Sequence, residues 1–351
     1  MSAAHYAGIM TGTSLDAASA ALCRAEGESF SLAAHAAVPI PPQLAADLRA
    51  LSCGGELEKA MRAADALTRL CADAFFALKA DSAAAMGCHG QTVLHRPDCG
   101  WTLQLLNGAL LAELTGVDVV CDFRSRDIAA GGQGAPLAPL FHRAVFAAHA
   151  PCAIVNLGGI ANITLLDENE NTRGWDICPA NMLLDAWHMQ HCGGSFDRGG
   201  AWAQGGAIIP PLLKQLRAHP FLHLPPPKSC GREQFDLRHF AETLAQYKPQ
   251  DAQATLLEWS ALEIAETINR AKIARVYLCG GGARNGALFA RIAELSEAEI
   301  LLTDDAGINA EYVEAAAFAW LAFQHLSGAA LNTPPITGAR GKRILGAHYP
   351  A

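Results

Sequence analysis

Three short apolar segments of this chain run directly into polar, glycine-rich turns, and this pattern limits the fold more than any other feature. The turns are Gly12-Thr13-Ser14, residues 156–162 and Gly280-Gly281-Gly282. The segments before them have the length and character of strands. A strand that ends in a glycine turn lets backbone N–H groups face a phosphate or a ribose. Taken singly, each turn is more typical of plain structure; together they indicate a nucleotide held by both halves of the chain.

Strands and helices alternate along the sequence. Apolar runs at 84–88 and 117–121 each stop at a polar cluster, and residues 107–115 between them have a helical pattern. Residues 43–80 carry apolar side chains at helical spacing, which predicts one or two amphipathic helices. This alternation is typical of an α/β domain, where ligands bind at strand ends.

The length of 351 residues favours two lobes rather than one. The cluster of glycine and proline at 129–139 is the best boundary. We therefore expect a first lobe over 1–128, to which residues 346–351 return, and a second lobe over 129–345. The three prolines at 225–227 predict a surface excursion within the second lobe.

Composition excludes several classes of function. Lys and Arg number 26 against 34 Asp and Glu, a net charge of −8 with no basic run, so a nucleic-acid groove is not expected. The 11 cysteines are scattered without metal-ligand spacing, as in the reduced chain of a cytoplasmic protein. The first residues lack the pattern of a signal peptide. The longest uncharged stretch, 144–166, is interrupted by proline, asparagine and glycine, so no membrane segment is expected.

Five carboxylates lie beside glycine, aromatic or apolar neighbours rather than in charged runs: Asp16, Asp122, Asp127, Asp176 and Glu314. Asp176 follows Trp175 and precedes a predicted helix over 182–191. Burial beside the indole favours the neutral acid and a helix N-terminus favours the anion, a balance suited to a general base. A helix-capping aspartate is an equally good interpretation. Glu314, the single charge of an apolar helix, either faces a ligand or complements the helix dipole.

Three further side chains are candidates for ligand binding. His89 begins the polar cluster His89-Gly90-Gln91-Thr92 and either orients a hydroxyl or is a satisfied core histidine, the second being slightly favoured. Arg124 and Arg126 would point to one side of an extended segment and clamp an anion. Pairing of these arginines with Asp122 and Asp127 at a lobe interface is an equal alternative.

At these residues the chain resembles the anhydro-N-acetylmuramic acid kinases, a family of the actin and sugar-kinase superfamily. The resemblance covers nearly the whole length. The motifs that carry it are Gly8-Ile9-Met10-Thr11-Gly12-Thr13-Ser14-Leu15-Asp16, His89-Gly90-Gln91-Thr92, Asp122-Phe123-Arg124, residues 127–137, Asn156-Leu157-Gly158-Gly159-Ile160-Ala161-Asn162, Cys279-Gly280-Gly281-Gly282-Ala283 and residues 337–346.

The resemblance implies an α/β, two-lobed actin-like ATPase fold of ribonuclease-H-like lobes, with the active site in the interlobe cleft. It implies an ATP-dependent kinase that opens the 1,6-anhydro ring of anhydro-N-acetylmuramic acid with water and phosphorylates O6. The products are N-acetylmuramic acid 6-phosphate and ADP, in cell-wall recycling. ATP and Mg²⁺ as cofactors, a cytoplasmic location and a homodimer follow from the same likeness.

The resemblance also implies roles for particular residues. Asp176 would activate the water. Phosphate and metal binding would fall to Gly12, Thr13, Ser14 and Asp16, with Asp16 holding the Mg²⁺; other nucleotide contacts would come from Gly158, Gly159, Gly280, Gly281 and Gly282. The sugar would be bound by His89, Gln91, Thr92, Arg126 and Glu314.

The chain departs from the family pattern at two places. Ala17 and Ser19 stand where the family has glycine and aspartate, and Cys178 stands where it has glycine. A side chain at position 178 is expected to strain the backbone if that position needs a glycine conformation. The carboxylate lost at Ser19 suggests one alternative, an actin-like nucleotide-binding protein with impaired catalysis. A second alternative is a related sugar kinase or phosphatase acting on another substrate.

Overall fold

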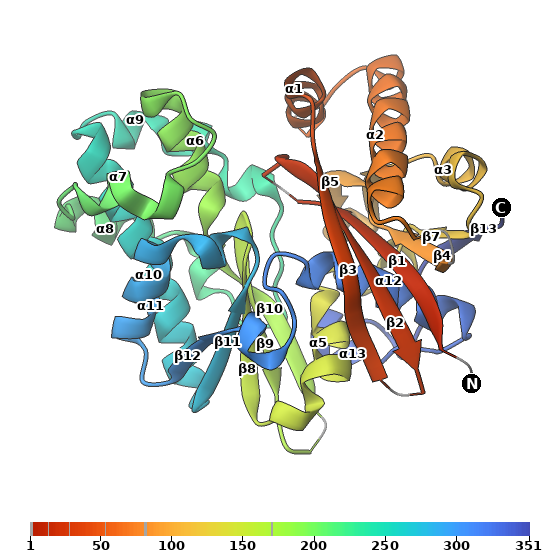
Figure 1. Ribbon diagram of the computed structural model, residues 1–351. Helices are drawn as coiled ribbons and strands as arrows, with labels where there is room; N and C mark the ends of the chain where they lie inside the picture. The colour runs from red at the N-terminus through yellow and green to blue at the C-terminus, as the bar shows by residue number, and fades with distance from the viewer. Residues whose placement is uncertain (1–2, 13, 28, 53, 81–82, 170) are drawn as a thin grey trace. The chain divides into compact units, whose positions relative to one another are not determined.

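The computed structural model describes residues 3–12, 14–27, 29–52, 54–80, 83–169 and 171–351. The chain forms two compact units, Met1–Ala148 with Tyr312–Ala351, and His149–Glu311 (Figure 1). This division differs from the expected lobes, because residues 129–148 and 312–345 group with the first unit. Helices in these two segments pack against the sheet of the first unit. This packing cannot be inferred from the glycine-rich composition at 129–139.

The first unit is built on a six-stranded sheet of order β13-β7-β4-β1-β2-β3. Its strands are β1 (Ala4–Thr11), β2 (Ala17–Glu26), β3 (Ser29–Pro39), β4 (Ala83–Cys88), β7 (Val119–Cys121) and β13 (Ala347–Tyr349). The first three strands form an antiparallel meander, and β4 and β7 continue the sheet in parallel with β1. A separate hairpin joins β5 (Gln91–Arg96) and β6 (Trp101–Leu105).

The helices of this unit cover both faces of the sheet (Figure 1). They are α1 (Pro42–Leu51), α2 (Leu57–Ala77), α3 (Gly108–Thr115), α4 (Ser125–Ala129), α5 (Ala138–Phe146), α12 (Val313–Leu326) and α13 (Pro334–Thr337). The predicted amphipathic helices over 43–80 are confirmed as α1 and α2. Their apolar stripe, including Leu67 and Cys71, packs with Ala7 and Ile9 of β1 in one buried core.

Helix α12 lies against the other face of the sheet, where two strands carry glycine. A Cβ atom at Gly8 of β1 would overlap the carbonyl oxygen of Ala315, and one at Gly87 of β4 would overlap that of Phe318. Successive strand residues point to opposite faces, so Ala7 and Ile9 fill the core under α2 while Gly8 makes room for α12. The alanine-rich sequence of α12 lets the two backbones approach closely.

The second unit has a five-stranded sheet of order β10-β9-β8-β11-β12. Its strands are β8 (Cys152–Leu157), β9 (Ile160–Leu166), β10 (Thr172–Pro179), β11 (Arg275–Cys279) and β12 (Glu299–Leu302). Strands β8, β9 and β10 form an antiparallel meander, and β11 and β12 follow in parallel with β8. The hairpin expected at 156–162 is confirmed.

The helices of the second unit are α6 (Asn181–Cys192), α7 (Ala201–Gln204), α8 (Pro210–Arg217), α9 (Ala241–Leu244), α10 (Pro249–Ala271) and α11 (Gly286–Leu295). Helix α10 is the longest of them and is buried along most of its length because it contacts α6, α7, α8, α11 and β10. Pro225, Pro226 and Pro227 are exposed, which confirms the surface excursion.

Both sheets therefore have the same plan. Three strands form an antiparallel meander, the first of them pairs in parallel with a fourth strand, and the fourth pairs in parallel with a fifth. This is the ribonuclease-H-like topology, and its occurrence in each unit confirms the expected α/β fold of the actin-like class. In both units the parallel strands end at the same edge, so their following turns lie together.

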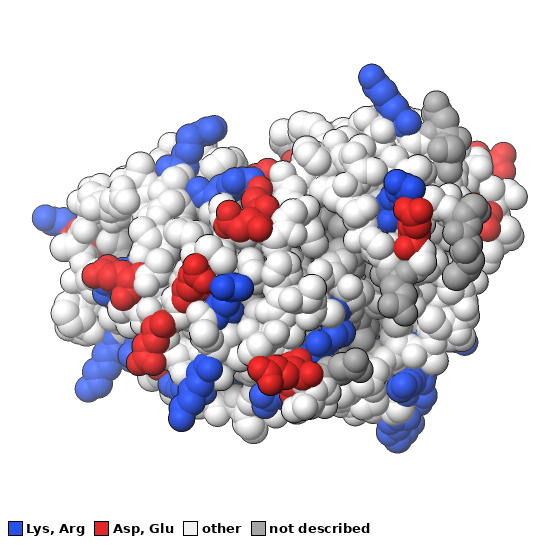
Figure 2. Space-filling model, turned by 60° about the horizontal axis from the view of Figure 1, so that its bottom comes forward, with Lys and Arg blue, Asp and Glu red and all other residues white. Residues whose placement is uncertain are grey.

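Exposed charges of both signs are interspersed on the face shown in Figure 2. Exposed ion pairs of the molecule include Arg62 with Glu58 and Arg284 with Asp304, and each pair contributes little to stability. In the part of the chain that the structure describes, none of the helices is both long and apolar enough to cross a bilayer.

The contact between α12 and the sheet gives a stability prediction. Gly87→Ala should lower the free energy of unfolding by about 3 kcal/mol, because the new methyl group overlaps helix backbone that has no room to shift. Gly286→Ala is the matched control, since its Cβ would meet only ordinary contacts. Urea denaturation measures both, and equal stability of the two variants would contradict the close packing.

Candidate functional site

The turn between β1 and β2 contains Gly12, Ser14 and Asp16; Thr13 lies outside the described residues. Leu15 adopts a left-handed conformation with φ of 60° and buries its side chain. Its N–H donates to Gly12 O at 3.2 Å, and Arg49 donates to Ser14 O at 3.2 Å. The buried leucine anchors the turn, while the side chain of Asp16 is exposed to solvent.

His89 lies next to this turn because β4 pairs in parallel with β1. Its ring nitrogen Nδ1 is 2.8 Å from Gly90 O, and Nε2 is 2.9 Å from Arg124 Nη2. A guanidinium can only donate, so Nε2 accepts and Nδ1–H donates. Burial, and then the charge of Arg124, hold the pKa of His89 well below its usual value. Both ring nitrogens of His89 therefore have protein partners. This is what the interpretation of His89 as a satisfied core histidine predicts.

Arg124 and Arg126 do not form the expected clamp. The segment is not extended: α4 begins at Ser125, so the two side chains leave the helix in different directions. Arg124 binds His89 and donates to Gly134 O at 2.8 Å, whereas the exposed Arg126 donates to Ile344 O at 3.1 Å. Side chains two residues apart point the same way only on an extended backbone, and residues 125–129 are helical.

The glycine-rich stretch after α4 wraps around a buried carboxylate. Asp127 is fully buried and accepts from Gly134 N and from Thr337 Oγ1, both at 2.8 Å. A Cβ at Gly132 would overlap the same carboxylate. This stretch is thus a packed element of the first unit. Among the described residues Asp127 bonds to no arginine, so the alternative pairing is not found.

The remaining predicted sugar-binding residues lie in the same unit. Gln91 is buried and, among the described residues, its Oε1 has no hydrogen-bond partner. Thr92 Oγ1 accepts from Gln104 on β6 at 3.2 Å. Glu314 is half-buried in the first turn of α12, the position in which a carboxylate complements the helix dipole.

In the second unit, two predicted glycine turns come together at the ends of β8 and β11. Asn181 Nδ2 donates to Leu157 O at 3.0 Å and to Gly158 O at 2.9 Å. A Cβ at Gly282 would overlap that amide nitrogen, and Gly280 has a φ of 83° that favours glycine. Asn181, at the start of α6, therefore binds the Gly158–Gly159 turn and lies against Gly282 of the 280–282 turn, a contact that the sequence did not reveal.

Asp176 lies on β10, within a row of polar residues that crosses the sheet. Asp176 pairs with Asn162 on β9, and Asn162 pairs in turn with Asn156 on β8. On the other side of β8, Asn156 pairs with Cys279 on β11. Directly opposite residues share a face of the sheet. Asp176 is buried, and its Oδ2 accepts from Cys230 N at 2.9 Å. Helix α6 begins after Ala180 without a side-chain cap, so the helix-capping interpretation of Asp176 is wrong.

The departures from the family pattern cause no backbone strain. Cys178 is a fully buried strand residue, with Sγ 3.9 Å from Ser260 O, and it is not among the described residues with positive φ. Strand register shifts between Asp176 and Cys178, which marks a bulge beside the carboxylate. Ser19 lies in the regular register of β2, opposite Met10 and Ala37. The expected strain at position 178 is therefore not found.

Two ribonuclease-H-like units with glycine turns at their strand ends define the class of proteins with the actin-like ATPase fold. The family model of anhydro-N-acetylmuramic acid kinase matches residues 4–351. The chain is 50% identical to the kinase of that name from Bordetella petrii, over 99% of this chain and 96% of that protein. It is 49% identical to the one from Thiobacillus denitrificans, over 99% and 97%. The chain belongs to the anhydro-N-acetylmuramic acid kinase family, and a kinase of this fold uses ATP.

The lowered pKa values of wholly or partly buried histidines predict how the free energy of unfolding depends on pH. Burial lowers the pKa of His89, that of His95 to about 4 and that of His142 to about 3. Below about pH 6.5 the unfolded chain binds protons that the folded chain does not, so stability falls as pH falls. The slope that each histidine contributes should rise from about 0.7 kcal/mol per pH unit at pH 6.5 toward about 1.4 kcal/mol per pH unit near pH 5. Urea denaturation at several pH values measures the slope.

His142→Phe tests the assignment, because it removes one of these contributions and leaves an aromatic ring beside Phe146. Its slope between pH 6.5 and 5 should be shallower than that of the wild type. An unchanged slope would mean that His142 takes up a proton in the folded state.

Proposed function

We propose that this protein phosphorylates 1,6-anhydro-N-acetylmuramic acid at O6 with ATP while water opens the anhydro ring, giving N-acetylmuramic acid 6-phosphate and ADP. The observation that carries the proposal is the family match over residues 4–351 together with the buried, hydrogen-bonded carboxylate of Asp176. The proposed setting is cell-wall recycling in the cytoplasm, with a homodimer as the working form.

Asp176 is proposed as the general base. The Cys230 N–H bond to Oδ2 stabilises the anion and fixes the orientation of the carboxylate. The anion takes a proton from water as the water oxygen bonds to the anomeric carbon and the bond from that carbon to O6 breaks. O6 then bonds to the γ-phosphorus of ATP while the bond from that phosphorus to the β–γ bridging oxygen breaks and ADP leaves. Asp176 then loses the proton to solvent. One side chain thus couples ring opening to phosphoryl transfer.

The glycine turns are proposed to bind the nucleotide. Backbone N–H groups at Gly12, Ser14, Gly158 and Gly159 would face phosphates, and residues 280–282 would face the adenosine. Among the described residues no cluster of three metal-binding side chains occurs. A single carboxylate still suits Mg²⁺, which keeps waters and takes phosphate oxygens as its other ligands. The exposed Asp16 fits this role, and bound Mg²⁺ would neutralise phosphate charge.

The sugar is proposed to bind to Gln91, Thr92, Arg126 and Glu314. The buried Oε1 of Gln91 can accept from a sugar hydroxyl or amide. Arg126 keeps further guanidinium donors for the lactyl carboxylate beyond the one used by Ile344 O. Since both ring nitrogens of His89 are occupied, His89 contributes by holding Arg124 and Gly90 beside Gln91.

The decisive experiment is turnover of Mg-ATP and the anhydro sugar in ¹⁸O-labelled water. Mass spectrometry should find one ¹⁸O at the anomeric position of N-acetylmuramic acid 6-phosphate, because water supplies that oxygen, together with one ADP per sugar. Folded, ATP-binding protein that releases no ADP in response to the sugar would overturn the proposal in favour of the impaired protein. Turnover of a different sugar would favour the related kinase.

Asp176→Asn tests the base. The variant should fold and bind ATP normally but lose at least ~10²–10⁴-fold in kcat, because an amide cannot accept the proton. The exposed Asp73→Asn is the control and should keep wild-type turnover. Steady-state ADP release and calorimetric ATP binding measure the two effects. Turnover close to wild type in Asp176→Asn would remove this residue from the mechanism.

A further inference from the structure

The segment 228–230 makes two hydrogen bonds with Asp176. The N–H of Asp176 donates to Lys228 O at 3.0 Å, and the N–H of Cys230 donates to Asp176 Oδ2 at 2.9 Å. The first bond fixes the strand backbone, and the second fixes the carboxylate. The orientation of Asp176 therefore depends on a segment that lies about fifty residues further along the chain and outside the sheet.

The side chain of Lys228 closes the loop that carries this segment. Its Nζ donates to Phe221 O and Leu222 O, both at 3.1 Å, and lies 4.6 Å from the centre of the Phe221 ring. The loop between contains three exposed prolines, which have no N–H groups with which to make backbone bonds of their own. Lys228 thus supplies donors that join the two ends of the loop.

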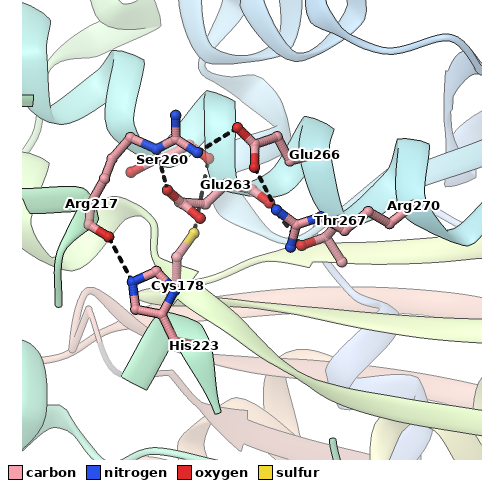
Figure 3. A network of polar contacts seen from close by, with 8 residues as sticks. All are labelled: Cys178, Arg217, His223, Ser260, Glu263, Glu266, Thr267 and Arg270. Carbon is pink, nitrogen blue, oxygen red and sulfur yellow. Dashed lines mark hydrogen bonds and ion pairs between the residues drawn. The ribbon is translucent and has the colours of Figure 1, made fainter. Parts of the chain in front are cut away.

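Helix α10 is bonded both to α8, which precedes the loop, and to strand β10, which carries Asp176. Arg217, at the end of α8, pairs with Glu263 and Glu266 of α10, and His223 Nε2 lies 3.1 Å from Arg217 O (Figure 3). On the β10 side, Ser260 Oγ of α10 donates to Pro179 O at 2.9 Å. The loop and the strand are thus fixed to one helix, and Lys228 completes the connection between them.

The side chain of Lys228 is half-buried in the second unit. Burial lowers the pKa of its ammonium group, and the groups that act in the opposite direction are Cys178, Cys230, Glu263 and Asp176. Among the described residues, the ammonium group of Lys228 bonds to two carbonyl oxygens and to no carboxylate. A half-buried lysine whose bonds go to loop carbonyls is suited to holding that loop.

We infer that Lys228 is a positioning residue: by joining the ends of the 221–228 loop, it keeps the N–H of Cys230 on Oδ2 of Asp176 and so holds the carboxylate anionic and correctly oriented. The inference rests on the proposed role of Asp176 as the base. It assigns to the 221–230 segment a function in catalysis although none of its side chains needs to touch the sugar.

Lys228→Met tests the inference, because it keeps the length of the side chain and removes the donors. We expect kcat to fall by about 10-fold or more, since a hydrogen bond to a charged group is weakened. The acidic limb of the pH–kcat profile should move upward by roughly half to one pH unit, because the anion loses its donor. KM for ATP should stay within about twofold, as the glycine turns are untouched.

Two matched variants complete the test. Lys228→Arg retains donors for Phe221 O and Leu222 O and should recover most of kcat and the wild-type acidic limb. Lys214→Met removes an exposed lysine of α8 in the same unit and should resemble the wild type in both respects. Circular dichroism and urea denaturation establish that each protein is folded.

A measurement without substrate separates this inference from the proposed function. With ¹³C-labelled aspartate carboxyl groups, assigned by the signal lost in Asp176→Asn, NMR follows the titration of Asp176 directly. Its midpoint should be higher in Lys228→Met than in the wild type, whatever sugar the enzyme uses. An unchanged midpoint and acidic limb in folded Lys228→Met would overturn the inference. A shifted midpoint in a protein without sugar-dependent turnover would retain it and contradict the proposed reaction.

Discussion

Parallel pairing of the first and fourth strands is the interaction on which the rest of each unit depends. In the first unit Ile9 lies beside Cys88, and in the second Asn156 lies beside Cys279. Each pairing brings two strand ends to one edge, so the turn that follows one strand lies beside the turn that follows the other. Backbone N–H groups from distant parts of the sequence can therefore face one ligand.

Buried polar groups around these turns are held by defined partners. The Arg124 guanidinium fixes the neutral tautomer of His89, and the carboxylate of Asp127 organises the glycine-rich stretch after α4. An unpaired polar group in such surroundings would cost about 1–3 kcal/mol. Each of these bonds also restricts the geometry of its neighbours. Asp176 follows the same rule, since its donor comes from the backbone of the 228–230 segment.

Strand ends, glycine turns and amphipathic helices were predictable because they depend on local residue type and period. The hairpin at 156–162 and helices α1 and α2 were found in this way. The unit boundaries differed, because the packing of α12 on Gly8 and Gly87 joins residues more than two hundred positions apart. The arginine clamp failed because residues 125–129 form a short helix whose N-cap residue is Arg124, a residue type that does not mark a helix start.

The sequence by itself determined the α/β class, the family, and the positions of the turns and of Asp176, because each is recorded in short contiguous patterns. Only the tertiary structure decided that Asn181 binds one glycine turn beside the other, that Asp176 belongs to a row across four neighbouring strands, and that the Lys228 carbonyl and the Cys230 N–H hold its backbone and carboxylate. The physical reason is strand register. Which side chains share a face, and which distant N–H reaches a carboxylate, follow from pairing and packing across the whole unit rather than from neighbours in the chain.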